Sequence, residues 1–180
     1  MISIKNRFSP LTRFLIKVGF IYASWQWLYD ALVLPDGRLD TWLSIAGVKL
    51  ASSGLRWGGW DIESAGRIIA CTGNRGVEIQ NGCNGMEILG LYSGLIIAYP
   101  GNMVRRVLFL FSGIGLLFFA NVFRIAFFTL SIFYFPSYWN PIHDYSSYVF
   151  FYPTVLILWY LWLYLNNPTD IFSTADLSSV

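Results

Sequence analysis

Two kinds of side chain with nucleophilic or acid–base chemistry, cysteine and histidine, are scarce in this chain of 180 residues, which contains two cysteines and one histidine. Cys83 stands just before an apolar run, His143 is the single histidine, and Arg124 interrupts a long apolar run. A thiolate is a nucleophile, and an imidazole can take the thiol proton and return it to a leaving amine. An arginine in such a run costs free energy when it is buried in a membrane, so its default interpretation is a functional or paired residue. Together these groups indicate acyl transfer through a thioester.

The residues after Cys83 are expected to favour its thiolate. Asn84 and Glu87 have the spacing of a capping box, with Asn84 as the cap of a helix whose positive end would face the thiol. Arg124 would supply a fixed cation or donors for an oxyanion. Asp144 or Asn121 would orient these groups.

Each of these residues also has a structural interpretation. A cysteine in an apolar protein is usually inert packing, and a disulfide between Cys71 and Cys83 would abolish the nucleophile. A lone histidine in a loop is more often a surface residue. Glu87 can be a purely structural partner of Arg124, and Asn121 can form a hydrogen bond between helices. The residues alone leave these alternatives open.

The composition indicates a membrane protein. Hydrophobic residues make up 56% of the chain, charged residues 12%, and the mean hydropathy is +0.53, whereas soluble domains carry about 25% charged residues. A net charge of +2 with dispersed basic residues argues against a nucleic-acid partner. One histidine and two cysteines make no plausible metal site. No metal and no cofactor are expected.

Apolar runs of about 20 residues predict membrane-spanning helices. The four candidates are residues 14–34, 88–104, 107–135 and 145–165. The first run lacks a cleavage site and is interpreted as a retained helix, not a removed signal peptide. Pro100 is expected to end the second run early, and Pro153 to kink the fourth. The predicted fold is an all-α polytopic membrane protein with about four to five transmembrane helices.

A single domain is expected over residues 1–165, with a polar segment, 35–82, inserted between the first two helices and a disordered tail over 166–180. Within the polar segment, residues 40–53 predict an amphipathic helix. Two strands near residues 67–70 and 77–80 predict a small β-hairpin.

The lysines and arginines orient the chain. Basic residues without nearby acids mark cytoplasmic segments, and they are Lys5, Arg7, Arg13, Lys17, Arg105 and Arg106. The segments 35–82 and 136–147 then face outward. The predicted location is the inner (cytoplasmic) membrane, multi-pass.

This orientation places the three chemical residues at one depth. Arg124 lies roughly 26 Å above the inner boundary at ~1.5 Å per residue, in the outer part of a ~30 Å core. Cys83 precedes the second helix at the outer face, and His143 lies in the second outer loop. The chemistry is therefore expected toward the periplasmic, extracytoplasmic face.

Three short segments resemble the motifs of the exosortase/archaeosortase family. They are residues 81–87 (NGCNGME), 121–125 (NVFRI) and 142–144 (IHD). Members of that family are polytopic membrane enzymes, thought to be cysteine transpeptidases, that process proteins with a C-terminal sorting signal. Such a signal combines a short motif, a transmembrane helix and a basic tail.

The resemblance implies a role for each matching residue. Cys83 corresponds to the nucleophile, Arg124 to the essential arginine and His143 to the third catalytic residue, whereas Asn121 and Gly85 correspond to supporting positions. The resemblance covers about residues 77–165. Many relatives are longer, with more spanning helices. The usual Cys-Ser-Gly reads Cys-Asn-Gly here, and Ser146-Ser147 replaces the glycine often seen after the histidine.

The favoured function is a membrane-embedded cysteine transpeptidase or protease that cleaves C-terminal sorting signals at the outer membrane face. Its expected partners are membrane-anchored substrate proteins, the lipid bilayer, and water or an amine on an envelope polysaccharide or lipid-linked acceptor. The alternative is a non-catalytic integral membrane subunit of an envelope polysaccharide export or assembly system. A small transporter fits less well, because the intramembrane charge is single and lies toward one face.

Overall fold

A computed structural model describes residues 9–166 of the chain. The tail expected to be disordered, apart from Asn166, lies outside the described residues, as do the basic residues Lys5 and Arg7.

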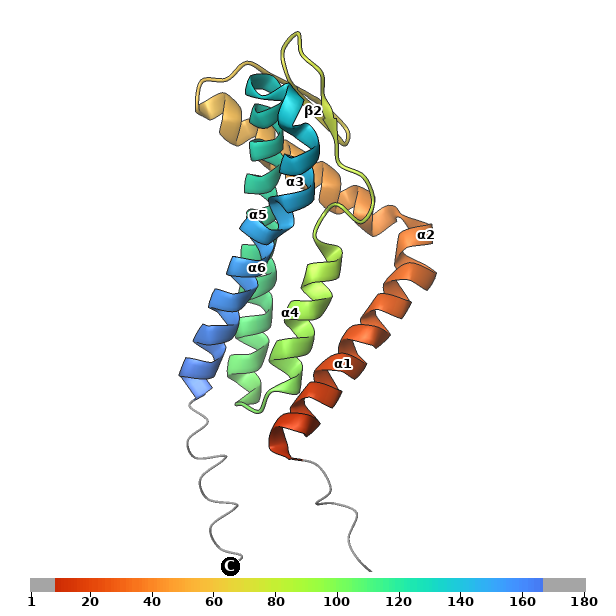
Figure 1. The fold of residues 1–180 in the computed structure, drawn as a ribbon, viewed down its shortest axis with the longest axis vertical. Helices are drawn as coiled ribbons and strands as arrows, with labels where there is room; N and C mark the ends of the chain where they lie inside the picture. The colour runs from red at the N-terminus through yellow and green to blue at the C-terminus, as the bar shows by residue number, and fades with distance from the viewer. Residues whose placement is uncertain (1–8, 167–180) are drawn as a thin grey trace, which may run out of the picture.

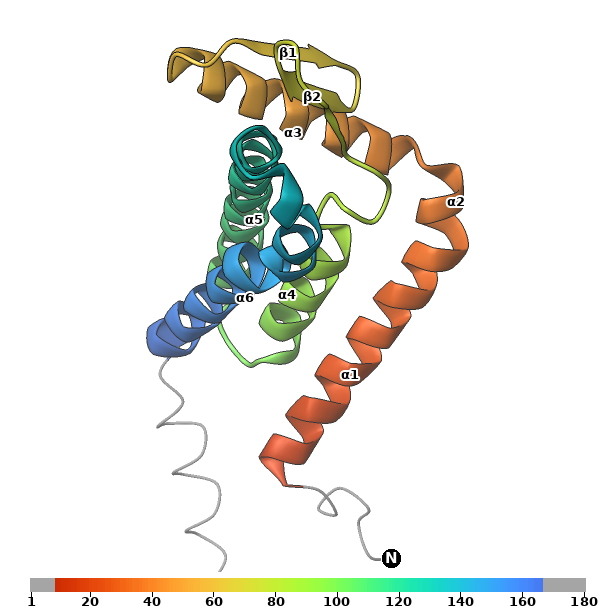
Figure 2. The same ribbon diagram turned by 45° about the horizontal axis from the view of Figure 1, so that its top comes forward.

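Four helices form a bundle, and a fifth helix with a small sheet covers one end of it (Figures 1 and 2). The bundle helices are α1 (Pro10–Leu28), α4 (Met86–Ala98), α5 (Met103–Tyr134) and α6 (Trp139–Asn166). The first residues of α1 and α5 and the last residues of α4 and α6 lie at the opposite, lower end in Figure 1. A π-helical turn (Tyr29–Val33) and the short helix α2 (Leu34–Asp36) lead from α1 to the covering helix. We call the covering helix and the sheet the cap.

Two helical segments among residues 9–166 are long and apolar enough to cross a membrane. They are Met103–Tyr134 and Pro136–Asn166, and α4 is a shorter apolar helix. Pro100 follows the end of α4 closely, as expected. The structure thus identifies two candidate spans, so the predicted four to five remain a proposal.

The cap is built on α3 (Arg38–Trp57), which is longer than the amphipathic helix expected over residues 40–53. One face of α3 is buried over its whole length, from Asp40 through Val48 to Leu55, whereas Trp42 on another face is 65% exposed. Gly37, in the left-handed region at φ 63°, separates α3 from α2. The buried face of α3 packs on α5 and on the sheet.

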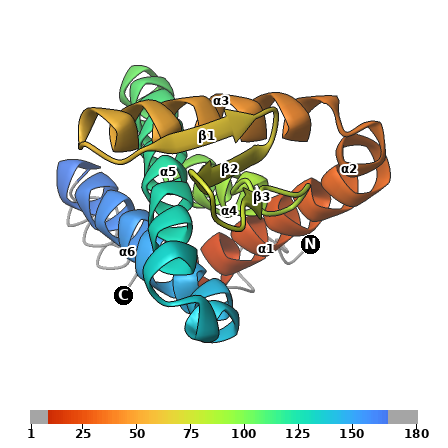
Figure 3. The same cartoon turned by 90° about the horizontal axis from the view of Figure 1, so that it is seen from above.

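The sheet has three antiparallel strands in the order β1 (Ile62–Ala65), β2 (Ile68–Cys71) and β3 (Val77–Glu78) (Figure 3). The predicted hairpin corresponds to β2 and β3. The prediction missed β1, which pairs with β2 across Gly66 and Arg67. Gly66 has a φ of 59°, so the two-residue turn depends on a glycine there.

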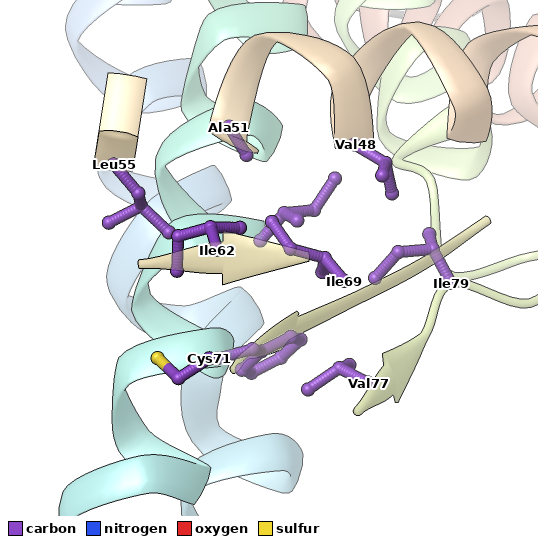
Figure 4. Packing of buried hydrophobic residues seen from close by; sticks show 10 residues of the cluster. Val48, Ala51, Leu55, Ile62, Ile69, Cys71, Val77 and Ile79 are labelled. Atoms are coloured by element: carbon purple, nitrogen blue, oxygen red, sulfur yellow. The ribbon is translucent and has the colours of Figure 1, made fainter. Parts of the chain in front are cut away.

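The buried side of the sheet forms the cap core with α3 and α5 (Figure 4). Its residues are Val48, Ala51, Leu55, Ile62, Ile69, Cys71, Val77, Ile79, Ile125 and Phe128. A second core lies between α4, α5 and α6, and its residues are Tyr92, Ile96, Tyr99, Leu117, Phe151, Val155, Leu158 and Trp162.

The expectation of a loop over residues 136–147 was wrong, because these residues are helical. A 3₁₀ turn (Pro136–Tyr138) follows α5, and α6 begins at Trp139, so His143 is a helical residue. Pro141 lies in the first turn of α6, where a missing N–H removes no intrahelical hydrogen bond. Arg105 and Arg106 likewise belong to the first turn of α5 and not to a loop.

Candidate active site

Cys83 lies in a tight loop between β3 and α4. The thiol is free and half-buried. Gly82 and Gly85 flank it with φ values of 80° and 88°, a region that side chains rarely adopt. A Cβ on Gly85 would also lie 3.1 Å from the ring of Phe151. The structure therefore gives a steric reason for glycine at position 85.

The expected capping box is not formed. The Asn84 Oδ1 does accept a hydrogen bond from the backbone N–H of Met86 at 3.1 Å, but Asn84 lies one residue before the N-cap position, which Gly85 occupies without a side-chain cap. However, α4 begins at Met86, so Glu87 stands one position too early to reach back to the cap, and its side chain is exposed. The carboxamide of Asn84 instead directs its Nδ2 toward α3.

A buried carboxylate on α3 holds the loop. Asp40 is fully buried, and its Oδ1 accepts hydrogen bonds from Asn84 Nδ2 at 2.7 Å, from the Gly82 N–H at 3.2 Å and from the Tyr29 hydroxyl at 2.8 Å. Two of these donors are the immediate neighbours of Cys83. Asp40 thereby fixes the backbone on both sides of the thiol.

Arg124, 5% exposed, reaches the same loop from α5. Its Nη1 donates to the Cys83 carbonyl oxygen at 3.0 Å, and its Nε donates to Ser146 Oγ on α6 at 3.0 Å. The guanidinium carbon lies 4.9 Å from the ring centroid of Phe128 and 5.2 Å from that of Phe151. No carboxylate is paired with this guanidinium among residues 9–166. The buried cation therefore has no acidic counter-ion in the described part of the chain.

His143 and Cys83 line one cavity of about 200 Å³ together with residues of β3. Phe128 and Trp139 form its other walls, and the imidazole ring lies 5.7 Å and 5.5 Å from their ring centroids. The Ser146 hydroxyl donates to the His143 carbonyl oxygen at 2.8 Å and so connects this turn to Arg124. The structure thus brings the three predicted catalytic residues together: Cys83 and His143 line one cavity, and Arg124 contacts the backbone of Cys83.

The three supporting residues other than Gly85 have different surroundings. Asp144 Oδ1 lies 3.4 Å from His143 Nδ1, consistent with the expected orienting contact. Asn121 is buried, but neither Nδ2 nor Oδ1 has a hydrogen-bond partner in the described structure, so it orients neither Cys83 nor His143 through a direct contact. Glu87 forms no recorded ion pair with Arg124, which removes its proposed structural role.

The other cysteine is separated from this site. Cys71 is 5% exposed, belongs to the cap core, and forms no disulfide with Cys83. Burial and the nearby Asp61 carboxylate raise the pKa of the Cys71 thiol above its ordinary value. A buried thiol of raised pKa has the properties of packing, not of a nucleophile.

A comparison with known protein families places the chain. Residues 9–160 match the family of transmembrane exosortases. The chain belongs to this family. No curated protein and no solved structure matched the chain. Membership makes this a membrane protein of the exosortase family, and the matched region contains the Cys83 loop, Arg124 and His143.

Several residues of this exosortase site were missed by sequence reasoning. Asp40 was assigned only to the start of a surface helix, and Tyr29 to a spanning helix. Ser146 was noted as a departure from the family pattern, without a contact. Phe128 follows Arg124 by one helical turn and Trp139 precedes His143 by one turn, so helical periodicity was the one signal that could have found them.

Among residues 9–166, no group of three or more His, Cys, Asp or Glu side chains is arranged to hold a metal ion. The chemistry that this arrangement can support is nucleophilic attack by a thiol, with an imidazole beside it and a fixed guanidinium behind the loop.

Proposed function

We propose that this exosortase is a cysteine transpeptidase or protease that cleaves the C-terminal sorting signals of membrane-anchored proteins through a thioester. The observation that carries the proposal is the contact of a buried guanidinium, Arg124, with the carbonyl of Cys83, beside a cavity that Cys83 shares with His143. A general membrane subunit has no need of this combination.

The electrostatics favour an anion beside the guanidinium of Arg124. Burying a guanidinium without a carboxylate is costly, and Arg124 has none among the described residues. Its recorded hydrogen bonds leave Nη2 without a partner. The Cys83 thiolate, or the oxyanion that forms after its attack, would supply the missing negative charge.

The proposed reaction has two steps. His143 takes the thiol proton, the Cys83 sulfur attacks the scissile carbonyl, and the tetrahedral intermediate collapses as the C–N bond breaks. The leaving amine receives the proton from His143. In the second step an acceptor amine or water gives a proton to His143 and attacks the thioester, which releases the acyl product and the thiolate, and His143 returns the proton to the sulfur.

The depth of the site suits such a substrate. Helix α4 has 13 residues, which span ~20 Å, less than the ~30 Å hydrocarbon core. If α1, α4, α5 and α6 all cross the inner membrane, the loop of Cys83 lies near the outer interface. A peptide bond just outside a substrate's transmembrane helix would then reach the thiol. We therefore place the cap on the extracytoplasmic side.

The test compares C-terminal peptides of membrane-anchored envelope proteins by mass spectrometry in cells that carry wild-type protein, Cys83→Ala or Cys71→Ala. We expect a set of proteins to keep its C-terminal helix in the Cys83→Ala cells alone. The Cys71→Ala variant is the matched control, since it also removes a thiol and lies in the cap core.

Two results would contradict the proposal. One is an unchanged set of C-terminal peptides when Cys83→Ala is present at wild-type level in the membrane. The other is an equal defect in both variants, which would indicate a folding effect. Either result would favour a non-catalytic subunit of an envelope assembly system.

A further inference from the structure

Strand β3 is an edge strand that lies beside the cavity of Cys83. The strand order is β1-β2-β3, so β3 pairs with β2 on one side only. Edge strands with a free row of N–H and C=O groups can pair with another extended chain unless they are covered. The surroundings of the free edge of β3 therefore decide whether another chain can pair with it.

The hydrogen-bond pattern shows which backbone groups point outward. The Ile79 N–H donates to the Arg67 carbonyl at 3.0 Å, and the Ile79 carbonyl accepts from Arg67 Nε at 2.6 Å. Hydrogen-bonded and non-hydrogen-bonded residues alternate in an antiparallel pair. Glu78, opposite Ile68, therefore directs its N–H and C=O away from β2, toward the free edge.

That edge lines two adjoining cavities. The larger, of about 480 Å³, lies between the residues around β3 and the end of α5 with the turn after it, and Pro136 and Trp139 are among its lining residues. The smaller is the cavity of Cys83 and His143. Val77, Glu78, Gln80 and Trp139 line both. The two cavities therefore share a wall along β3, and together we call them the β3 groove.

The two faces of the strand also differ in burial. Val77 and Ile79 are buried at 5% and 2% exposure and hold the strand to the cap core, whereas Glu78 and Gln80 are exposed. Because core packing and the pairing with β2 already fix β3, a second chain could add to its outer edge without rearranging the sheet.

We propose that the substrate binds as an extended segment that pairs with the outer edge of β3, with the Glu78 backbone as its main hydrogen-bonding partner. This strand addition would carry the scissile carbonyl along the β3 groove to Cys83. Main-chain pairing of this kind gives affinity, and the flanking pockets give selectivity for alternate side chains. The inference rests on the proposed function, since it needs a polypeptide substrate.

Photo-crosslinking tests the position of the substrate. In a Cys83→Ala chain, which is expected to retain uncleaved substrates, Gln80 is replaced by p-benzoylphenylalanine. A matched chain carries the same residue in place of Glu63, which is exposed on β1 at the opposite edge of the sheet. We expect crosslinks from position 80 to the segment next to the cleavage site of the proteins that keep their C-terminal helix. Position 63 should give at least about tenfold fewer.

A backbone variant tests the pairing itself. Glu78→Pro removes the outward N–H, whereas Glu78→Ala keeps it and removes only the exposed side chain. Loss of one such hydrogen bond should lower processing about tenfold in Glu78→Pro, and Glu78→Ala should cost about twofold. Alkylation of Cys83 by a small maleimide at the wild-type rate shows that Glu78→Pro has kept its fold.

The outcomes separate this inference from the proposed function. Suppose that processing depends on Cys83. Equal crosslinking from positions 80 and 63, or equal losses of processing in the two Glu78 variants, would then overturn strand addition and leave the proposed function intact. If Glu78→Pro is misfolded, the crosslinks decide by themselves. If processing does not depend on Cys83, both the function and the strand addition are wrong.

Discussion

The cap and the bundle have cores of different residue composition. The cap core consists mainly of Val, Ile, Leu and Ala from α3, the sheet and the end of α5, and it encloses an ordinary buried cysteine. The bundle core is rich in aromatic side chains, such as Tyr92, Phe151 and Trp162. The outer surface of the bundle exposes large apolar residues, including Phe111 at 72% and Phe123 at 67%. These exposed apolar side chains fit a membrane protein.

The candidate site lies where these two cores meet. Arg124 stacks between Phe128 of the cap core and Phe151 of the bundle core. The loop of Cys83 is bound from the cap by Asp40 and from α5 by Arg124. Either region alone would leave the Cys83 loop without the hydrogen bonds that the other region supplies. The geometry of the site therefore depends on the docking of the cap onto the bundle.

Arg124→Lys should have the largest effect. An ammonium cannot reproduce the planar fork that reaches both the Cys83 carbonyl and Ser146, so processing should fall on the order of 100-fold. Arg106→Lys is the control, because Arg106 contacts Tyr99 and Gly101 carbonyls at the other end of α5. Processing rates of both variants, measured on the proteins identified with Cys83→Ala, check this. Wild-type processing by Arg124→Lys would remove Arg124 from the site.

Asp40→Asn should weaken the cap side of the site. The Asp40 Oδ2 is buried without a recorded partner in the described structure, so an amide N–H₂ there would lack an acceptor, and the charge that holds the loop would be lost. We expect about tenfold slower processing, through kcat more than KM, and slower alkylation of Cys83. Tyr29→Phe removes one of the three donors and should give a smaller loss. Unchanged alkylation of Cys83 in Asp40→Asn would show that Asp40 does not position the loop.

The two thiols should differ in native labelling. At pH 7.5 a maleimide should modify Cys83 at least about tenfold faster than Cys71, because thiolate character and exposure both set the rate. The raised pKa of Cys71 means that its thiolate appears only as the pH rises beyond the ordinary value of about 8.5. Peptide mapping after timed labelling measures both rates. Equal rates at neutral pH would contradict the distinction between cap core and site.

Gly113→Ala should disturb the bundle and spare the site. A Cβ at Gly113 would collide with the Tyr92 hydroxyl, whereas one at Gly115 would meet nothing within 4 Å. Gly113→Ala should therefore cost about 1–3 kcal/mol of stability, and Gly115→Ala should be neutral or stabilise by up to about 1 kcal/mol. Thermal unfolding in detergent compares them. A loss of Cys83 labelling in folded Gly113→Ala protein would show that bundle and site are more tightly coupled than the two cores suggest.

The sequence alone determined the features that depend on local pattern. Long apolar runs predicted α5 and most of α6, because a helix in lipid must satisfy its own backbone hydrogen bonds and expose apolar side chains to lipid. The rise of a helix placed Arg124 at the depth of Cys83, and the hydrogen bond between them agrees. Alternation and turn residues predicted the hairpin of β2 and β3.

Only the tertiary structure decided the contacts between distant segments. In the sequence, Asp40 resembles any acidic residue near the start of an amphipathic helix. In the fold, α3 places its carboxylate beside Asn84 and Gly82, and both donate hydrogen bonds to it. Ser146 faces Arg124 because α6 packs against α5, which a reading of the two helices one at a time does not predict. Glu87 has the spacing of a cap but points outward, because Asn84 is held by Asp40 and the helix begins later. These contacts form because buried polar groups need hydrogen-bond partners, and here the partners come from distant segments of the chain. A local sequence pattern does not specify such partners.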